Sequence, residues 1–102
     1  MSEIIKDNMP DTELLFELAD LFKVFGDSTR IRIICALFEA ELPVYGISEL
    51  LGLEQSTVSH QLRILRQNKL VKVRKDGKQS FYSLSDEHVR KIFDMGLSHI
   101  ME

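Results

Sequence analysis

The sequence predicts a single, mainly α-helical domain that carries one β-hairpin. Apolar residues recur every three or four positions over most of the 102-residue chain, which is the period of amphipathic helices. Between residues 70 and 84 the apolar period shortens, and an Asp-Gly pair divides this segment into two halves. That pattern favours a β-hairpin. The resulting order of helix, helix, helix-turn-helix, hairpin and helix predicts a winged helix-turn-helix fold.

The first two helices are bounded by polar and glycine residues. Asp11 is expected to cap a helix that ends at Gly26. A second helix follows Asp27 and stops before Pro43. The polar segment 1–10 is predicted to be flexible, so the folded domain covers residues 11–102.

A tight turn joins the next two helices. Residues 47–51 are expected to form a short helix capped by Gly52, and a longer helix runs from Gln55 to Asn68. The hairpin comes next, and the last helix begins at Asp86 and continues to the C-terminus.

Composition limits the class of protein. A chain of this length forms one domain and is small enough that association with a second copy is plausible. No apolar run approaches the ~18 residues that a membrane-spanning helix needs, and the N-terminus lacks the order of a signal peptide. The single cysteine, Cys35, cannot form an internal disulfide.

The absence of a membrane span, of a signal peptide and of an internal disulfide together predicts a cytoplasmic protein with no membrane partner. Cys35 is expected on the buried side or edge of its helix, in a small apolar role.

The formal net charge of −3 conceals a basic block. Residues 55–80 contain seven lysines and arginines and one acid, whereas residues 1–54 contain four basic and eleven acidic residues. A charge-rich solvated face would explain a single charge run. Here the block coincides with the second helix of the helix-turn-helix and the hairpin, which is the distribution expected of a protein that binds nucleic acid.

The helix that begins at Gln55 has the side chains of a recognition helix. Hydroxyls, amides and an arginine in its first turns can reach base edges and phosphates in a major groove, while the cations of the hairpin suit phosphate contact. Taken singly, Ser56 could be a helix-start residue and His60 a surface histidine. The candidate DNA-binding residues are Gln55, Ser56, Thr57, Ser59, His60, Arg63, Lys72, Arg74, Lys75 and Lys78.

Three stretches of the chain resemble the ArsR/SmtB family of bacterial metal-sensing repressors. They are FKVFGDSTRIRIICAL, ISELLGLEQSTVSHQLRILRQNKLV and VRKDGKQSFYSL. The resemblance covers nearly the whole chain from about Leu14. It implies a homodimer of winged helix-turn-helix subunits joined mainly by the first and last helices. It also implies that the metal-free dimer binds operator DNA and that the effector weakens this binding.

The last helix contains candidate metal ligands at its two ends. His88 and His99 lie on one stripe of a helix, and Glu102 shares it. Eleven residues nevertheless rise ~16 Å along the axis, whereas zinc binds histidine nitrogen at ~2 Å. One helix therefore cannot place all the ligands around one ion. An antiparallel pair can join Asp86 and His88 of one subunit to His99 and Glu102 of the other, provided that Asp86 occupies the non-helical cap. Symmetry then gives two sites per dimer.

Two imidazoles and two carboxylates suit Zn(II), with Co(II) also compatible. A capping aspartate, two surface histidines and a frayed terminal glutamate would explain the same residues without a metal. The resemblance favours the site, because the zinc-sensing branch has D-x-H, ten residues and then H-x-x-E or H-x-x-H on this helix. It also implies that His99 donates to a backbone carbonyl near Lys69. Thiol-based members have a cysteine box, but residues 41–46 contain no cysteine.

The residues and the resemblance together predict a repressor that zinc releases from an inverted-repeat operator. The resemblance implies that metal efflux or homeostasis genes are then derepressed. A repressor of the same fold that senses no metal is the main alternative. A metal-storage or protein-binding module is a more distant one, because it leaves the basic block unexplained. An enzyme is not expected, since the chain lacks a phosphate loop and a nucleophile-base pair. The choice among zinc, cobalt and nickel, and the role of the terminal carboxylate of Glu102 as a competing ligand, stay open.

Overall fold

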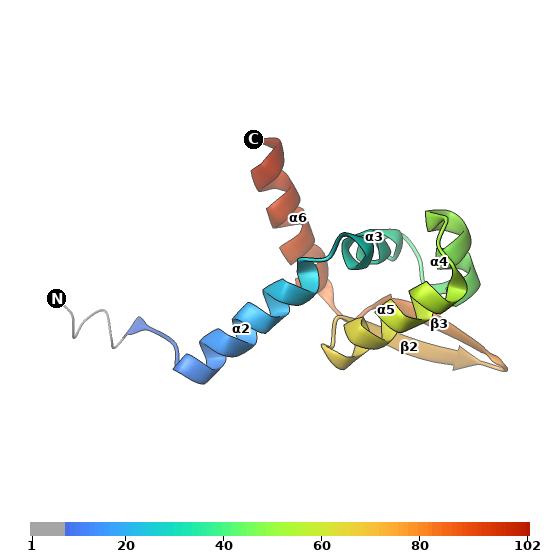
Figure 1. Cartoon of the computed structure of the whole chain (residues 1–102), viewed down its shortest axis with the longest axis horizontal. Coiled ribbons are helices and arrows are strands. Elements are labelled where there is room, and N and C mark those ends of the chain that lie inside the picture. The colour runs from blue at the N-terminus through green and yellow to red at the C-terminus, as the bar shows by residue number, and fades with distance from the viewer. Residues whose placement is uncertain (1–7) are drawn as a thin grey trace.

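The computed structural model describes residues 8–102. Most of the segment predicted to be flexible, residues 1–10, lies outside the described residues. The elements, in chain order, are α2 (Thr12–Phe25), α3 (Ser28–Ala36), β1 (Leu42–Pro43), α4 (Val44–Leu51), α5 (Gln55–Gln67), β2 (Val71–Asp76), β3 (Gln79–Leu84) and α6 (Glu87–Met101) (Figure 1). The mainly helical class with a β-hairpin wing is confirmed.

Three helix ends have well-formed caps, of which Gly52 and Asp86 were predicted. The Asp27 carboxylate accepts the backbone N–H of Arg30 at 3.0 Å, and the Asp86 carboxylate accepts that of His88 at 2.9 Å. Gly52 ends α4 with a φ of 68°, a left-handed conformation that costs glycine little. Asp11 occupies the N-cap of α2, although its side chain makes no capping hydrogen bond.

The segment between α3 and α4 differs from the prediction. α3 ends at Ala36, well before Pro43, and α4 begins at Val44 rather than Ile47. The sequence analysis missed β1, in which Leu42 pairs with Tyr82 and Pro43 with Phe81 of β3. Proline lacks a backbone N–H, so it fits only at a sheet edge, where Pro43 also serves as the N-cap of α4.

The sheet has the strand order β1-β3-β2, and β2 and β3 form the hairpin. Their antiparallel register runs from Val71 opposite Leu84 to Asp76 opposite Gln79. The connection is therefore two residues long, and Gly77 enters it with a φ of 64°. This geometry matches the short hairpin turns that require glycine.

The core lies among α3, α4, α5 and the base of the hairpin. Its largest fully buried side chains are Ile33, Ile34, Ile47, Val58, Leu62 and Leu65. Arg30 fastens the core to the end of α2, because its guanidinium donates to the carbonyls of Val24 at 2.8 Å and Lys23 at 3.3 Å, and to Gln61 of α5 at 3.2 Å.

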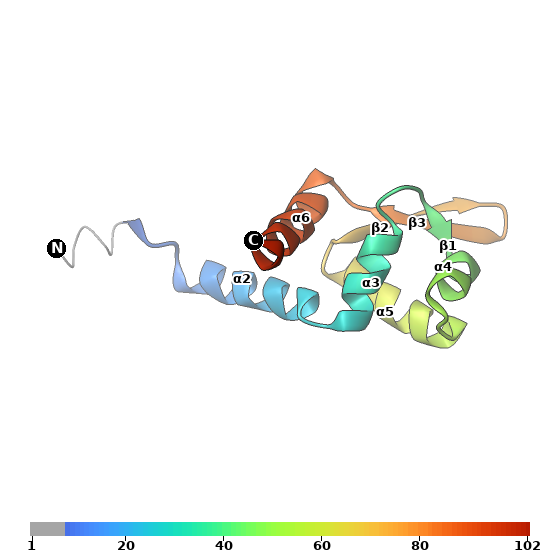
Figure 2. The same cartoon turned by 90° about the horizontal axis from the view of Figure 1, so that it is seen from above.

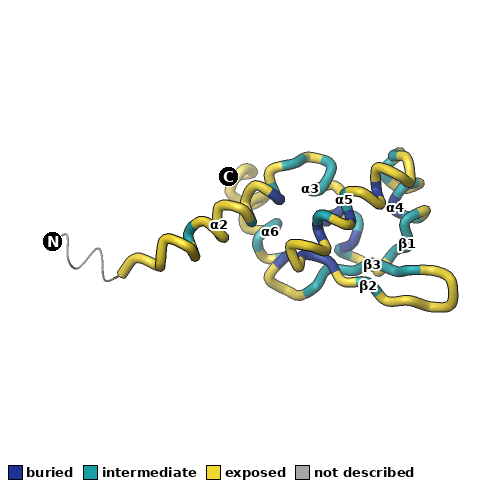
Figure 3. Tube along the Cα trace, turned by 60° about the horizontal axis from the view of Figure 1, so that its bottom comes forward, coloured by how far each residue is buried: buried dark blue, intermediate teal, exposed yellow. Residues whose placement is uncertain are grey.

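Helix α2 and the C-terminal half of α6 extend from this body (Figures 1 and 2). Most residues of α2 are exposed and only Val24 is buried, whereas α5 has three buried residues, Val58, Leu62 and Leu65 (Figure 3). Large apolar side chains are exposed on both helices: Leu14, Phe16, Leu18, Phe22, Met95, Leu97, Ile100 and Met101. Phe22 of α2 and Ile92, Phe93 and Gly96 of α6 line a shared apolar groove of about 280 Å³.

The prediction for Cys35 was wrong, because its side chain is exposed. Ile33, Ile34 and Leu37 take the core face of α3, and the 100° step per residue turns Cys35 away from it. No helix in residues 8–102 is long and apolar enough to cross a membrane.

Candidate functional site

Helix α5 presents a polar face to solvent. Val58, Leu62 and Leu65 are fully buried and fix the orientation of the helix. At 100° per residue, Ser56, His60 and Arg63 gather on the opposite side. All six predicted DNA-binding residues of this helix, namely Gln55, Ser56, Thr57, Ser59, His60 and Arg63, are exposed.

The four cations of the hairpin are exposed, but they are not equivalent. Successive strand residues point to opposite faces of a sheet. Lys75 therefore shares the face of Val71, which is buried against the core, while Lys72 and Arg74 lie on the other face. Lys78 is in the turn, at the tip of the wing.

Arg74 is engaged within the chain. Its Nε lies 3.2 Å and 3.3 Å from the two carboxylate oxygens of Glu41, and its Nη2 also bonds that carboxylate. The guanidinium lies 5.0 Å above the centre of the Phe81 ring. The hydrogen bond from Arg74, together with the charges of Arg74 and Lys72, lowers the pKa of Glu41, and Glu41 in turn raises the pKa of Arg74. The sequence analysis did not detect Glu41, because it reaches Arg74 from 33 positions away.

The four predicted metal ligands form two separate pairs at the ends of α6. Asp86 is the non-helical N-cap, as the prediction required, and its Oδ1 lies 3.4 Å from Nδ1 of His88. At the other end, Nδ1 of His99 lies 3.7 Å from Oε2 of Glu102. Within residues 8–102 no three histidine, cysteine or acidic side chains are grouped to hold a metal. Within one chain the four predicted ligands therefore do not come together around one point.

Comparison with known proteins identifies the family. The model of the "Bacterial regulatory protein, arsR family" matches residues 27–73. A cadmium resistance transcriptional regulatory protein CadC homolog from Staphylococcus aureus is 37% identical over 84% of this chain and 72% of its own length. The chain belongs to the arsR family. A transcriptional repressor SmtB homolog from Synechocystis is 38% identical over 84% of the chain, which spans 65% of that relative, just under two thirds.

The arsR-family fold is also found among solved structures. The homodimeric winged helix-turn-helix DNA-binding domain of a Mycobacterium bovis protein superimposes with a TM-score of 0.83 at 26% identity, covering 93% of this chain and 90% of that one. The elements that carry the candidate residues therefore occur in a known DNA-binding arrangement.

In this arsR-family chain, a cleft of about 280 Å³ adjoins the start of α5. Tyr45 of α4, Gln55 of α5, and Gln79 and Ser80 of β3 line it. Only Gln55 was among the predicted residues. The pairing of β1 with β3 draws the start of α4 toward the wing, and because the sequence analysis missed β1, it gave no reason to group these side chains.

The end of α5 is tied to the start of α6 within one chain. The Ser85 hydroxyl donates to the Lys69 carbonyl at 2.6 Å, and the Ser85 N–H donates to the Leu70 carbonyl at 3.0 Å. Lys69 has a φ of 61°, which directs the chain from the helix into β2. The carbonyl near which His99 was expected thus already accepts one hydrogen bond, from the residue next to Asp86.

Proposed function

We propose that the chain is a homodimeric transcriptional repressor whose metal-free form binds an inverted-repeat operator in double-stranded DNA. Zn(II), with Co(II) also compatible, binds between the subunits, lowers DNA affinity and derepresses metal efflux or homeostasis genes. The observation that carries this proposal is the placement of two exposed ligand pairs at opposite ends of α6. Each pair alone is an incomplete tetrahedral site, and two antiparallel copies of α6 complete both.

The apolar surface of α2 and α6 supports the dimer. Phe22 and Ile100 are 56% and 79% exposed, and large contiguous apolar patches mark interaction sites. Burial of this face against a second copy places two α5 helices in one molecule. Two such helices then read half-sites about one DNA turn apart.

Zinc acts by favouring one dimer shape. Drawing ligands of two subunits to ~2 Å from one ion fixes the relative position of the two α6 helices. The hydrogen bonds of Ser85 attach the start of α6 to the end of α5, so a shift of α6 alters the separation of the reading helices. A coupling of ~1–3 kcal/mol weakens DNA binding ~5–150-fold, and DNA weakens zinc binding by the same factor.

Fluorescence anisotropy tests the proposal. The probe is a labelled duplex that the metal-free dimer has selected from a random-sequence pool, titrated with and without saturating zinc. His99→Ala should bind this duplex as the wild type does and lose the response to zinc. Ser98→Ala, on the same exposed turn, is the matched control and should keep the response. Zinc-dependent release of DNA by His99→Ala would refute α6 as the sensor and leave a repressor that responds to another signal.

The ligand set has an independent test in metal binding. Two Zn(II) ions per dimer are expected, and affinity should fall with decreasing pH because protons compete with the metal for imidazole and carboxylate. Co(II) should give tetrahedral absorption bands without intense sulfur-to-metal charge transfer. A strong near-ultraviolet thiolate band that disappears in Cys35→Ser would contradict the predicted ligands.

A further inference from the structure

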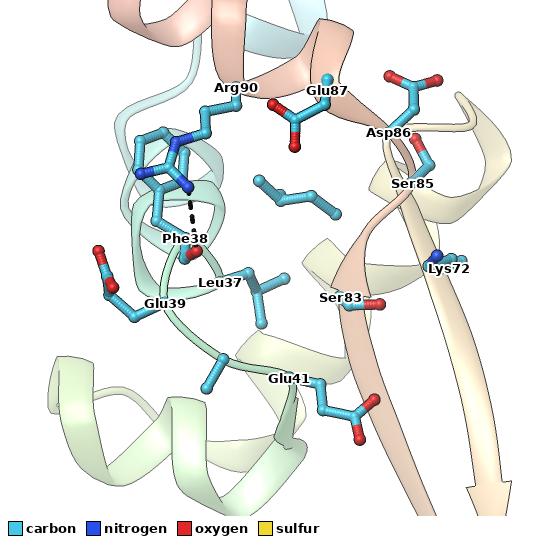
Figure 4. Close-up of a pocket in the computed structure, with 12 residues that line it drawn as sticks. Leu37, Phe38, Glu39, Glu41, Lys72, Ser83, Ser85, Asp86, Glu87 and Arg90 are labelled. Carbon is cyan, nitrogen blue, oxygen red and sulfur yellow. Dashed lines mark hydrogen bonds between the residues drawn. The ribbon is translucent and has the colours of Figure 1, made fainter.

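The segment between α3 and β1 touches both the sensor helix and the wing. We call residues 37–41 the bridging loop. It borders an open cavity of about 560 Å³ whose other walls come from the start of α6, from β3 and from Lys72 of β2 (Figure 4). Glu39 and Ala40 in the middle of the loop are exposed, so the loop is fastened mainly at its ends.

At its first end the bridging loop is held by α6. Nη1 of Arg90 donates to the Phe38 carbonyl at 3.4 Å (Figure 4). The Arg90 guanidinium lies 4.8 Å above the centre of the Phe38 ring, and the Phe93 ring meets Phe38 edge-on at a centroid distance of 4.8 Å. Arg90 is two residues beyond His88, so a displacement of this end of α6 also moves Phe38.

At its second end the bridging loop is held by the wing. The Glu41 carboxylate bonds the guanidinium of Arg74 through both Nε and Nη2. A bidentate pair of this kind fixes orientation as well as distance. Arg74 lies opposite Phe81 in the strand register and stacks on its ring. Glu41 directly precedes β1, whose pairing with β3 holds its backbone beside the hairpin.

We propose that Glu41 is a positioning residue for DNA binding: through Arg74 it sets the angle of the wing, and the bridging loop passes movements of α6 to that wing. The inference rests on the proposed DNA-binding and zinc-sensing function, and it adds a second connection to that of Ser85. Ser85 joins α6 to the recognition helix, whereas the bridging loop joins α6 to the hairpin. The alternative role for Glu41 is that of a carboxylate that competes with DNA phosphate for Arg74.

The two roles of Glu41 predict opposite effects of Glu41→Gln. A positioning carboxylate, once neutralised, leaves the wing free to swing and lowers operator affinity. A competing carboxylate, once neutralised, releases Arg74 and raises it. Glu39→Gln is the matched control, because it removes the same charge from the same loop and Glu39 makes no ion pair within residues 8–102.

The experiment uses the full-length dimer and the selected duplex, with and without saturating zinc. Relative to Glu39→Gln, Glu41→Gln should bind DNA roughly two- to thirtyfold more weakly without metal and show a smaller zinc-induced change. Its zinc affinity without DNA and its thermal unfolding midpoint should match those of the control, because the pair is exposed. Equal behaviour of the two variants, or tighter binding by Glu41→Gln, overturns the inference while leaving the zinc response of the wild type as the separate test of function.

A double-mutant cycle with Arg74→Lys adds a second criterion. Lysine keeps the charge but loses the planar fork. If the pair acts as one unit, Arg74→Lys and Glu41→Gln should each weaken DNA binding, and the double variant should be little weaker than either. Additive effects of the two substitutions overturn the inference, because they mean that Glu41 and Arg74 act on DNA independently.

Discussion

Two regions of the molecule contain similar apolar residues but differ in how far these are buried. One is the body, formed by α3–α5 and the hairpin, and the other is the pair of end helices, α2 and α6. Ile33, Ile47 and Leu62 have no exposed surface, whereas Phe22 and Ile100 are mostly exposed. One chain therefore completes the body that reads DNA in our proposal. The end helices, which carry the candidate ligand pairs, have an exposed apolar face that a second copy covers in the same proposal. In our proposal each subunit forms its own DNA-reading surface, whereas a metal site needs ligands from both subunits.

The largest effect is expected from a substitution that disrupts association through the end helices and leaves the body folded. Phe22→Glu places a charge in the apolar groove between α2 and α6. If a second copy buries this position, the unpaired charge costs about 3–5 kcal/mol of association. Sedimentation should show monomers at concentrations where the wild type is dimeric, and zinc titration should lose the intersubunit sites.

Thr12→Glu adds the same charge to an exposed polar position of α2 and should remain dimeric. Circular dichroism should show that the body of Phe22→Glu stays folded. If Phe22→Glu dimerises like the wild type, this face is not the interface.

A substitution in the body should act through folding instead. Ile47→Ala removes a fully buried side chain from α4 and should cost about 2–5 kcal/mol of the free energy of unfolding. Leu50→Ala on the same helix is the control, because Leu50 is exposed, and it should change stability by less than about 0.5 kcal/mol. Denaturant unfolding measures both. A loss for Ile47→Ala no larger than that for Leu50→Ala would contradict the distinction between body and surface.

Local signals in the sequence predicted most elements of the fold. The Asp86 cap and the hairpin glycine each depend on residues a few positions away, so the local sequence was enough to predict both. β1 was missed because two residues give no periodicity, and the pairing partner of Leu42 is 40 positions away. Cys35 was misplaced because the apolar residues of α3 occupy more than one face, and the sequence did not fix which face the core covers.

The features of the candidate site that depend on local geometry were also predictable from the sequence, and those that depend on tertiary contacts were not. Exposure of the α5 residues follows from the helical period, and the separation of the two ligand pairs follows from the rise per residue. The ion pair between Glu41 and Arg74 depends on tertiary proximity, which no local pattern reports. Assembly of a metal site depends on a second chain and stays a prediction.

A smaller effect is expected where the body meets DNA. Arg63→Ala removes a guanidinium from the exposed face of α5. If Arg63 reaches a base edge, the substitution costs about 1–3 kcal/mol of binding and relaxes the preference at that base pair. Anisotropy with the selected duplex and with single-base variants of it measures both effects. Unchanged affinity and unchanged preference would remove Arg63 from the reading surface.

The smallest effect is expected in the wing, and it distinguishes the predicted role of the wing in DNA binding from that of α5. Lys75 lies on the wing face that it shares with Val71, and its predicted contact is to phosphate, which carries no sequence information. Lys75→Ala should therefore weaken binding to every duplex alike and lower the slope of log K against log salt by about one, because one counterion fewer is released. Lys23→Ala removes the same charge from α2 and should leave the slope unchanged. A Lys75→Ala variant that changes the ranking of duplexes, rather than the salt slope, would place this side chain at a base edge and make the wing part of the reading surface.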